Sequence, residues 1–196
     1  MKKQEIHNKL IAVGRDLVIQ NGPDFLTARK LSDASKCSVG TIYNQFSNMD
    51  KFILEQNMIT LDELKQEIAN TKSTPDSYKN INLCMEVFVD YVISNSNLWF
   101  LLYGFHLKTS YAKLPKKYLK KLLEINMIWE GFFDDIFSKL TKNEKTIAKE
   151  VLWISVFSLS ALLTTDTLTG LAKINKRNIC RLLLNTYLAG LRTLKK

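Results

Sequence analysis

One segment, residues 26–52, constrains this chain more than any other. Its sequence, LTARKLSDASKCSVGTIYNQFSNMDKF, holds two short helical patterns separated by a three-residue turn and followed by a longer one. Thr27 is suited to cap a helix over 28–35, and Ser38 to cap a second helix over 39–45. Two short helices joined in this way predict a helix-turn-helix, whose second helix enters the major groove of DNA.

The second short helix is predicted to divide its side chains between the protein core and DNA. Three apolar residues share one face and should point to the core: Val39, Ile42 and Phe46. On the other face, Gly40 lets the helix come close to the duplex, while Thr41 and Asn44 can contact base edges. Tyr43 is suited to a backbone phosphate. An ordinary helical corner whose polar residues face water fits the bare pattern about equally well.

The wider pattern resembles the DNA-binding signature of the TetR/AcrR transcriptional regulators. The residues that carry the resemblance are Leu26-Thr27, Lys36-Cys37-Ser38, Gly40-Thr41-Ile42-Tyr43, Phe46 and Asn48-Met49-Asp50-Lys51-Phe52. A preceding amphipathic helix that ends in Gly22 is also similar to the family. The resemblance implies an N-terminal three-helix head and a ligand-responsive repressor that binds a pseudo-palindromic DNA operator. The expected DNA contacts are Thr27, Arg29, Lys36, Ser38, Val39, Gly40, Thr41, Tyr43, Asn44 and Lys51.

Two positions depart from the family pattern. Lys36 stands where the family usually has Gly, so the turn must accept a Cβ atom, or Lys36 reaches a phosphate. Met49 stands where a basic residue is usual, and Lys51 is the nearest substitute. These departures keep an alternative open, namely a small-molecule-binding or interaction protein whose helix-turn-helix head has weak or lost DNA binding.

Hydrophobic periodicity predicts an all-α protein of about nine helices. Gly and Pro are scarce, and no stretch alternates as a strand would. We expect a helix-turn-helix DNA-binding domain over 1–48 and an effector-binding and dimerisation domain over 49–196. The predicted helices span about 3–21, 28–35, 39–45, 48–70, 75–94, 95–108, 115–140, 142–170 and 175–194. Thr141 and Glu144 are predicted to form a capping box before the eighth helix.

Composition and charge narrow the class of protein. The hydrophobic fraction of 46% in 196 residues argues against disorder. The net charge of +9 favours attraction to DNA, yet residues 1–50 hold only seven Lys or Arg against five acids. Six lysines lie over 108–121 with no acid between them. We interpret that cluster as a solvated loop and helix start, in preference to a second nucleic-acid patch.

Nothing in the sequence indicates a membrane or a secreted protein. The uncharged run 151–165 is too short to span a bilayer, and charged residues interrupt the first helix where a signal peptide would be apolar. The three cysteines, Cys37, Cys84 and Cys180, lie far apart without metal-ligand spacing. We therefore expect a cytoplasmic protein with reduced thiols.

The two helices nearest the C-terminus carry more apolar surface than one small core needs. Two such helices from each protomer predict a four-helix homodimer interface, which the family resemblance also implies. The expected interface residues are Ile154, Phe157, Ala161, Leu183, Tyr187 and Leu188. An intramolecular core explains the same stripes and remains the alternative.

Aromatic residues concentrate between residues 91 and 157. Such a stripe usually packs a core, but the resemblance implies an effector cavity in this part of the chain. The expected lining is Met58, Trp99, Tyr103, Met127, Trp129, Phe133 and Trp153, around a small apolar or aromatic effector.

An enzyme is not indicated by any motif. The sequence lacks a nucleophile elbow, a phosphate-binding loop and a dinucleotide-binding fingerprint, so we predict no catalytic residue, no cofactor and no metal. His106 is the one histidine after residue 48, and we expect a surface or hydrogen-bonded core residue rather than a ligand.

Overall fold

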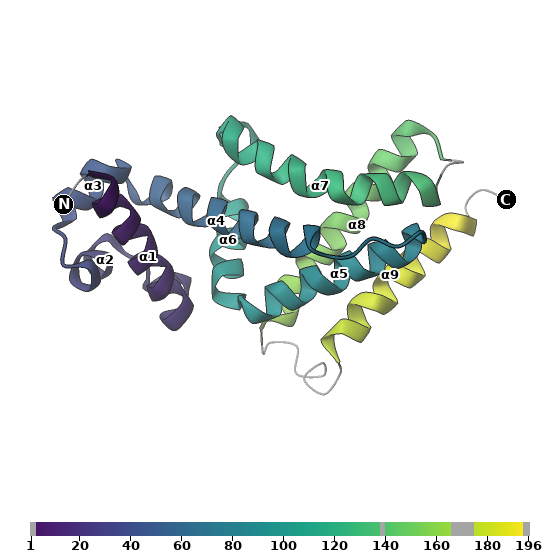
Figure 1. The fold of residues 1–196 in the computed structure, drawn as a ribbon, viewed down its shortest axis with the longest axis horizontal. Coiled ribbons are helices and arrows are strands. Elements are labelled where there is room, and N and C mark those ends of the chain that lie inside the picture. Colours follow the sequence, from purple (N-terminus) through teal and green to yellow (C-terminus); the bar gives the residue numbers. More distant parts are fainter. Residues whose placement is uncertain (1–2, 138–139, 166–174, 194–196) are drawn as a thin grey trace. The chain divides into compact units, whose positions relative to one another are not determined.

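The computed structural model describes residues 3–137, 140–165 and 175–193. Within these residues the chain is helical and has no strand, which confirms the predicted fold class (Figure 1). The helices are α1 (Lys3–Asn21), α2 (Ala28–Ser35), α3 (Val39–Phe46), α4 (Met49–Ala69), α5 (Ser77–Ser94), α6 (Ser96–Lys108), α7 (Lys116–Ile136), α8 (Lys142–Leu163) and α9 (Lys176–Thr193). Two short 3-10 turns are η1 (Pro23–Phe25) and η2 (Tyr111–Lys113).

The helices form two compact units. The first unit holds residues 1–62 and 95–119, and the second holds residues 63–94 and 120–196. Because the division falls inside α4 and α7, each of these helices contributes to both units. The units follow packing rather than function, so the expected division into a DNA-binding and an effector-binding domain remains a prediction.

The first unit is built around α1, which packs against α2 and α6. Asn97 of α6 donates a hydrogen bond from its Nδ2 to the carbonyl of Ile19, at 2.9 Å. Helix α6 thus completes the core of the helix-turn-helix, although the two are far apart in sequence. The buried core residues are Leu10, Val18, Leu26, Leu31, Ile42, Phe46, Phe52, Leu98 and Leu101.

Gly14 permits a close approach between α1 and α4. A Cβ atom on Gly14 would lie 2.3 Å from Cζ of Phe52, so the phenyl ring occupies the space of the missing side chain. Phe52 is fully buried and meets Phe46 edge-on, with ring centroids 4.8 Å apart. One turn further along α4, Gln56 donates to the carbonyl of Ile11 at 2.8 Å. These contacts hold α4 against α1.

The helix-turn-helix has the caps that its sequence predicts. The Thr27 hydroxyl accepts a hydrogen bond from the backbone N–H of Lys30 at 3.2 Å, and the Ser38 hydroxyl accepts one from Thr41 at 3.1 Å. Lys36 ends α2 in the left-handed conformation, with φ 58° and ψ 26°. The turn therefore accepts a residue with a Cβ atom where glycine is the usual solution.

Three predicted helix ends are wrong, including that of α7, which ends at Ile136 rather than near residue 140. Helix α5 begins at Ser77 rather than Pro75, because the Asp76 side chain accepts hydrogen bonds from two backbone N–H groups of the first turn, at 2.9 and 3.1 Å. Helix α8 ends at Leu163 rather than near residue 170, and residues 166–174 lie outside the described part of the chain.

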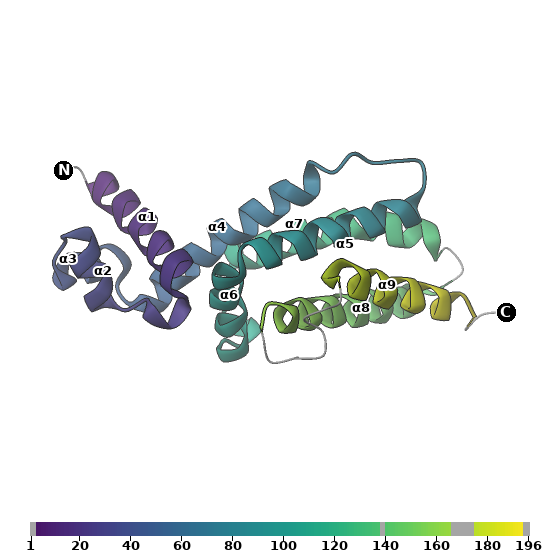
Figure 2. The same cartoon turned by 90° about the horizontal axis from the view of Figure 1, so that it is seen from below.

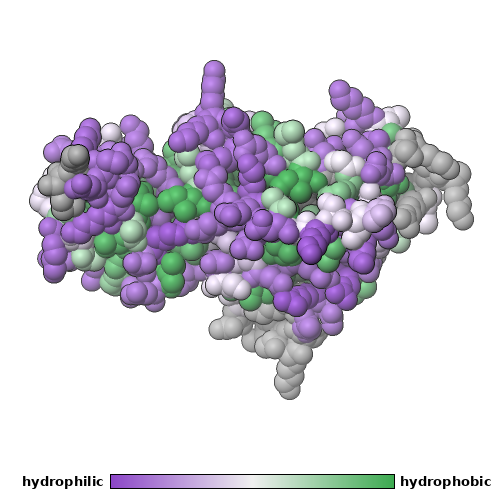
Figure 3. All heavy atoms as spheres, in the orientation of Figure 1, coloured by the Kyte–Doolittle hydropathy of each residue, from purple (hydrophilic) through white to green (hydrophobic). Residues whose placement is uncertain are grey.

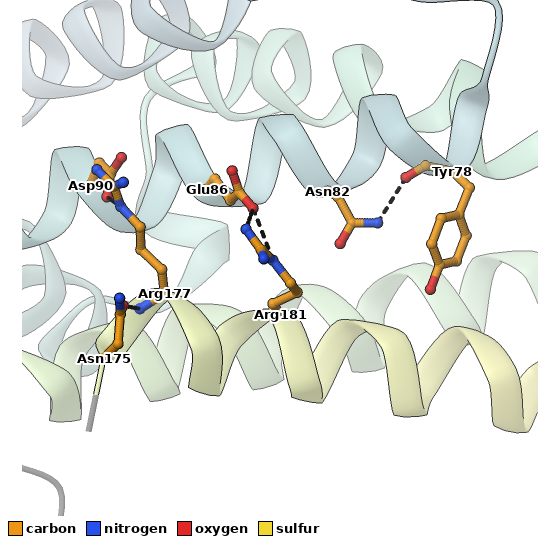
Figure 4. Close-up of polar contacts among 7 residues, drawn as sticks. All are labelled: Tyr78, Asn82, Glu86, Asp90, Asn175, Arg177 and Arg181. Carbon is orange, nitrogen blue, oxygen red and sulfur yellow. Dashed lines mark hydrogen bonds and ion pairs between the residues drawn. The ribbon is translucent and has the colours of Figure 1, made fainter.

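In the second unit, α5, α8 and α9 pack against one another (Figures 1 and 2). A ladder of polar contacts joins α5 to α9, and Figure 4 shows its two ion pairs. Its contacts are Arg177 Nε to Asp90 Oδ1 at 2.6 Å, Arg181 to Glu86, and the Tyr78 hydroxyl to Asn185 Oδ1 at 2.8 Å. Exposed ion pairs of this kind contribute about 0–1 kcal/mol each, so we expect the ladder mainly to set the rotation of α9.

Helix α8 begins with the predicted capping box. Thr141 Oγ1 accepts from the Glu144 backbone at 3.4 Å, and Glu144 Oε2 accepts from the Thr141 backbone at 2.8 Å. Among the described helices, α8 alone is long and apolar enough to cross a membrane, which by itself is weak evidence. Two ion pairs tie its first half to α7, namely Lys145 with Asp134 and Lys149 with Glu130. We therefore interpret α8 as a surface helix of the second unit.

Lys36→Gly is expected to raise the melting temperature. The left-handed conformation costs a residue with a Cβ atom roughly 1–2 kcal/mol, while the greater freedom of glycine in the unfolded chain offsets about 0.5–1 kcal/mol of the gain. Lys9→Gly, at an exposed position inside α1, is the control and should destabilise the protein by about 1 kcal/mol. Thermal unfolding followed by circular dichroism measures both. Equal destabilisation by the two variants would mean that the Lys36 backbone is not strained.

Candidate functional site

The outer face of α3 is the centre of the candidate DNA interface. Ile42 and Phe46 are buried, as predicted, and Gly40, Tyr43 and Asn44 are exposed. The prediction that Val39 faces the core is wrong, because its side chain is 37% exposed. Val39 is the first residue of α3 and lies at the end of the buried stripe, so it adds an apolar group to the exposed face.

The geometry of α3 leaves room for a close approach from outside. A Cβ atom on Gly40 would meet only Ser38 Oγ, at 3.8 Å, so the fold itself does not require glycine there. Half-buried Thr41 places its hydroxyl 2.9 Å from the same Ser38 oxygen. The Thr41 methyl and hydroxyl are thereby held in one orientation beside exposed Asn44.

Four other predicted contacts lie on the surface of the first unit. Thr27, Arg29 and Lys36 are exposed on or beside α2, and Lys51 is exposed in the first turn of α4. Asn48 caps α4 by accepting from the Lys51 backbone at 2.9 Å. Met49, which replaces the basic residue of the family, packs partly buried against the core of the first unit. It cannot supply a phosphate contact, and Lys51 is the cation nearest to it in the sequence.

The structure divides the predicted effector lining between the two units. Met58, Trp99 and Tyr103 belong to the first unit, where Trp99 is buried. Met127 belongs to the second unit and is 67% exposed, and it does not line the pocket that holds Trp153. The Trp129 side chain lies outside what the structure describes. Of the expected lining residues that the structure describes, Phe133 and Trp153 share a cavity.

A small pocket in the second unit lies between α5, α7 and α8. Its volume is about 90 Å³, and its lining residues are Ile81, Met85, Asn126, Glu130, Phe133, Thr146, Lys149, Glu150, Leu152 and Trp153. Trp153 also contacts Phe88 and Phe157, with ring centroids 5.5 and 5.8 Å away. Lys149 Nζ pairs with Glu130 Oε1 at 3.1 Å among the polar lining residues. The pocket combines an aromatic wall with an ion pair, as a site for a compact aromatic ligand would.

Apolar side chains are also exposed along α8 and α9. The face seen in Figure 3 carries hydrophobic areas within a largely hydrophilic surface. The predicted interface residues Ala161 and Leu188 are buried within the protomer, whereas Ile154 is 60% exposed. Phe157, Leu183 and Tyr187 are half-buried. Further exposed apolar positions on these two helices are Ile147, Val151, Leu162 and Leu182.

The exposed apolar residues of α8 form a second stripe along the helix. Ile147, Val151, Ile154 and Leu162 recur on one side of α8, opposite the stripe that includes buried Leu152. Periodicity finds apolar stripes but does not say which of two stripes faces the protomer core. The second stripe forms a continuous candidate surface for another protein chain.

His106 and Tyr118 form a buried pair in the first unit. His106 Nε2 lies 2.7 Å from the Tyr118 hydroxyl, which confirms that this histidine is a hydrogen-bonded core residue. Burial lowers the pKa of His106 and raises the pKa of Tyr118, so both groups are neutral near pH 7. In the described ranges, no three His, Cys, Asp or Glu residues come together where they could hold a metal ion.

Comparison with known proteins identifies the fold. No protein-family model and no curated protein sequence matches the chain. Solved structures match over nearly its whole length. The TetR family transcriptional regulator PfmR from Thermus thermophilus is 12% identical, with a TM-score of 0.65, and the match covers 92% of this chain and 97% of that chain.

Two further structures give the same result. A TetR transcriptional regulator from Rhodococcus sp. RHA1 is 13% identical, with a TM-score of 0.67 and coverage of 96% of this chain and 98% of that chain. The transcriptional regulator FadR from Bacillus subtilis, solved in complex with stearoyl-CoA, is 14% identical, with a TM-score of 0.63 and coverage of 94% and 98%. The chain therefore has the fold of TetR transcriptional regulators, and these three similar structures are of regulators rather than enzymes.

Proposed function

We propose that this chain is a transcriptional regulator that binds a pseudo-palindromic DNA operator as a homodimer and responds to a small molecule. The exposed face of α3 carries the proposal, because it combines open space at Gly40 with Thr41, Tyr43 and Asn44 on a helix capped by Ser38. Similarity to the TetR fold over nearly the whole chain supports the same conclusion.

Helix α3 would lie in the major groove with Gly40 nearest the bases. Asn44 would read a base edge, and the Thr41 methyl or hydroxyl would contact a neighbouring base. Tyr43, Thr27 and Lys51 would contact backbone phosphates, which position the protein without reading sequence. The expected domains, 1–48 for DNA and 49–196 for effector and dimer contacts, belong to this proposal.

Dimerisation would use the exposed apolar faces of α8 and α9. The α5–α9 ladder contacts one side of α9. Leu182 on α9 and Ile154 on α8 remain exposed. Two protomers that join these faces would form a four-helix interface and present two heads to two half-sites. We also infer a cytoplasmic location, because the proposed partner is a DNA operator.

The effector would occupy the pocket lined by Phe133 and Trp153. Its volume of about 90 Å³ is smaller than the roughly 150 Å³ of an apolar cavity that holds benzene, so a compact aromatic ligand would require the pocket to enlarge on binding. Helices α4 and α7 both run from one unit into the other and are two of the covalent routes for a change. Coupling requires that the ligand bind the DNA-competent and the relaxed dimer with different affinity.

An alternative function is a small-molecule-binding or interaction protein whose head has lost DNA binding. The packed position of Met49 favours it, since one expected phosphate contact is missing. The affinity for the promoter region of its own gene, measured as a function of salt, distinguishes the two functions. Phosphate contacts produce a steep fall of affinity with salt, whereas a lost head gives weak and sequence-independent binding.

Gly40→Ala is expected to weaken operator binding without harming the fold. The new methyl group meets only Ser38 Oγ at 3.8 Å in the free protein, so any loss must come from the DNA side. Asn44→Ala should reduce the preference for operator over scrambled DNA by about 1–3 kcal/mol. Fluorescence anisotropy measures binding, and circular dichroism checks the fold. Asn178→Ala, exposed on α9, is the control and should bind as wild type. Unchanged operator preference in Asn44→Ala would contradict the docking of α3.

Ile154→Glu and Leu182→Glu are each expected to convert the dimer to a monomer. Both side chains are more than half exposed in the protomer, at 60% and 68%, so a charge there should spare the protomer fold. Light scattering coupled to gel filtration measures the mass. Ile19→Glu is the matched control, because Ile19 is 50% exposed on α1 and should leave the dimer intact. Variants that remain dimeric would place the interface elsewhere.

Binding of a compact aromatic compound to the second unit is expected to quench tryptophan fluorescence and weaken operator binding over the same concentration range. Trp153→Phe should remove much of the quenching, because Trp153 lines the pocket, whereas Trp99 lies buried in the first unit. Titrations of wild type and variant with one compound provide both readouts. Quenching without any change in operator affinity would mean that the pocket is not coupled to DNA binding.

A further inference from the structure

The first unit contains a groove of about 730 Å³, which is much larger than the Phe133–Trp153 pocket of the second unit. Its floor is apolar and comes from two helices: Ile53 and Leu54 of α4, and Phe100, Leu101 and Phe105 of α6. Leu101 is buried and the other four are half-buried, so their faces toward the groove are open to solvent. The groove lies entirely within the first unit and shares no residue with the Phe133–Trp153 pocket.

Three lysines line the same groove, namely Lys51, Lys108 and Lys113. All three are exposed, and none of them forms an ion pair with another residue that the structure describes. Two acids also line it, Asp24 and Asp50. The cations are therefore in excess, by one charge, and are available to a ligand.

The charged lining residues come from two different parts of the first unit. Asp24 and Asp50 come from η1 and the first turn of α4, where they accompany Lys51. Lys108 and Lys113 come from the end of α6 and from η2, in a stretch that has six lysines and no acid over 108–121. Helix α7 starts directly after Pro115, which also lines the groove, so the positive end of its dipole adds to this part of the groove. The part of the lining that comes from the α6–α7 connection is thus cationic.

We propose that this groove binds a medium-chain carboxylate. The carboxylate would pair with Lys108 and Lys113, and the alkyl chain would cover the floor formed by Phe100, Phe105 and Leu54. A single negative charge matches the small excess of cations, while the acids at η1 and α4 disfavour a second anionic group near them. An amphipathic anion also removes from water the apolar floor that the protomer leaves open.

The position of the groove gives such a ligand a route to the DNA-reading head. Lys51 belongs both to the groove and to the expected phosphate contacts, and α6 contributes Leu98 and Leu101 to the core around α3. The binding assignment does not depend on DNA recognition, and a protein with a silent head would bind the carboxylate equally well.

The test uses the full chain and isothermal titration with decanoate below its aggregation concentration. Gly104 lines the groove, and a Cβ atom there would meet nothing within 4 Å, so Gly104→Leu should fill the groove without a clash. We expect this variant to lose affinity for decanoate by about tenfold or more, equivalent to at least about 1.4 kcal/mol. Gly131→Leu is the matched control, because Gly131 is also on a helix, in open space and outside the groove.

The charge requirement is tested separately. Lys108→Gln combined with Lys113→Gln should weaken decanoate binding by a similar factor, and decyltrimethylammonium should bind wild type at least about tenfold more weakly than decanoate does. The lysine variant keeps the test decisive if Gly104→Leu lowers the melting temperature. Equal binding of the cation and the anion, unchanged binding in the lysine variant, or undetectable binding of decanoate at millimolar concentration would each overturn the proposal. A failure of operator binding alone would leave it standing.

Discussion

Phe52 packs into the space that Gly14 leaves open on α1, and the geometry of the helix-turn-helix depends on this contact. The Phe52 ring lies edge-on against Phe46, the last residue of α3, so the position of α4 on α1 also sets the position of α3, the proposed DNA-reading helix. A hydrogen bond from Gln56 to the carbonyl of Ile11 joins the same two helices. A small displacement of one of these helices is passed to the next, because protein interiors are packed as densely as crystals of small organic molecules.

The two candidate ligand sites differ in how they connect to this contact between α1 and α4. The groove is made by α4 and α6, whose side chains belong to the same compact unit as α3. The Phe133–Trp153 pocket belongs to the second unit, from which α4 and α7 continue into the first. A ligand in the groove would act on the core of the head directly, whereas a ligand in the pocket would act along a helix.

Charge is distributed in a way that composition alone does not indicate. The net charge of +9 has only a small contribution from residues 1–50, while a run of lysines follows α6. From the sequence this run is interpreted as a solvated surface. In the structure, Lys108 and Lys113 from this run line an apolar groove. Cations beside apolar side chains make this groove a candidate site for an amphipathic anion.

Sequence by itself determined the helices of the head, their caps at Thr27 and Ser38, and the all-α class, because capping and periodicity depend on residues three or four positions apart. Tertiary structure decided what those local signals do not contain. Asn97 bonds to Ile19 across 78 positions, and with it α6 and Trp99 join the unit that carries the head. Tertiary structure also decided that Leu188 is buried and Leu182 is exposed. Two apolar stripes on one helix cannot be told apart in the sequence, because only packing against a neighbouring helix buries one of them.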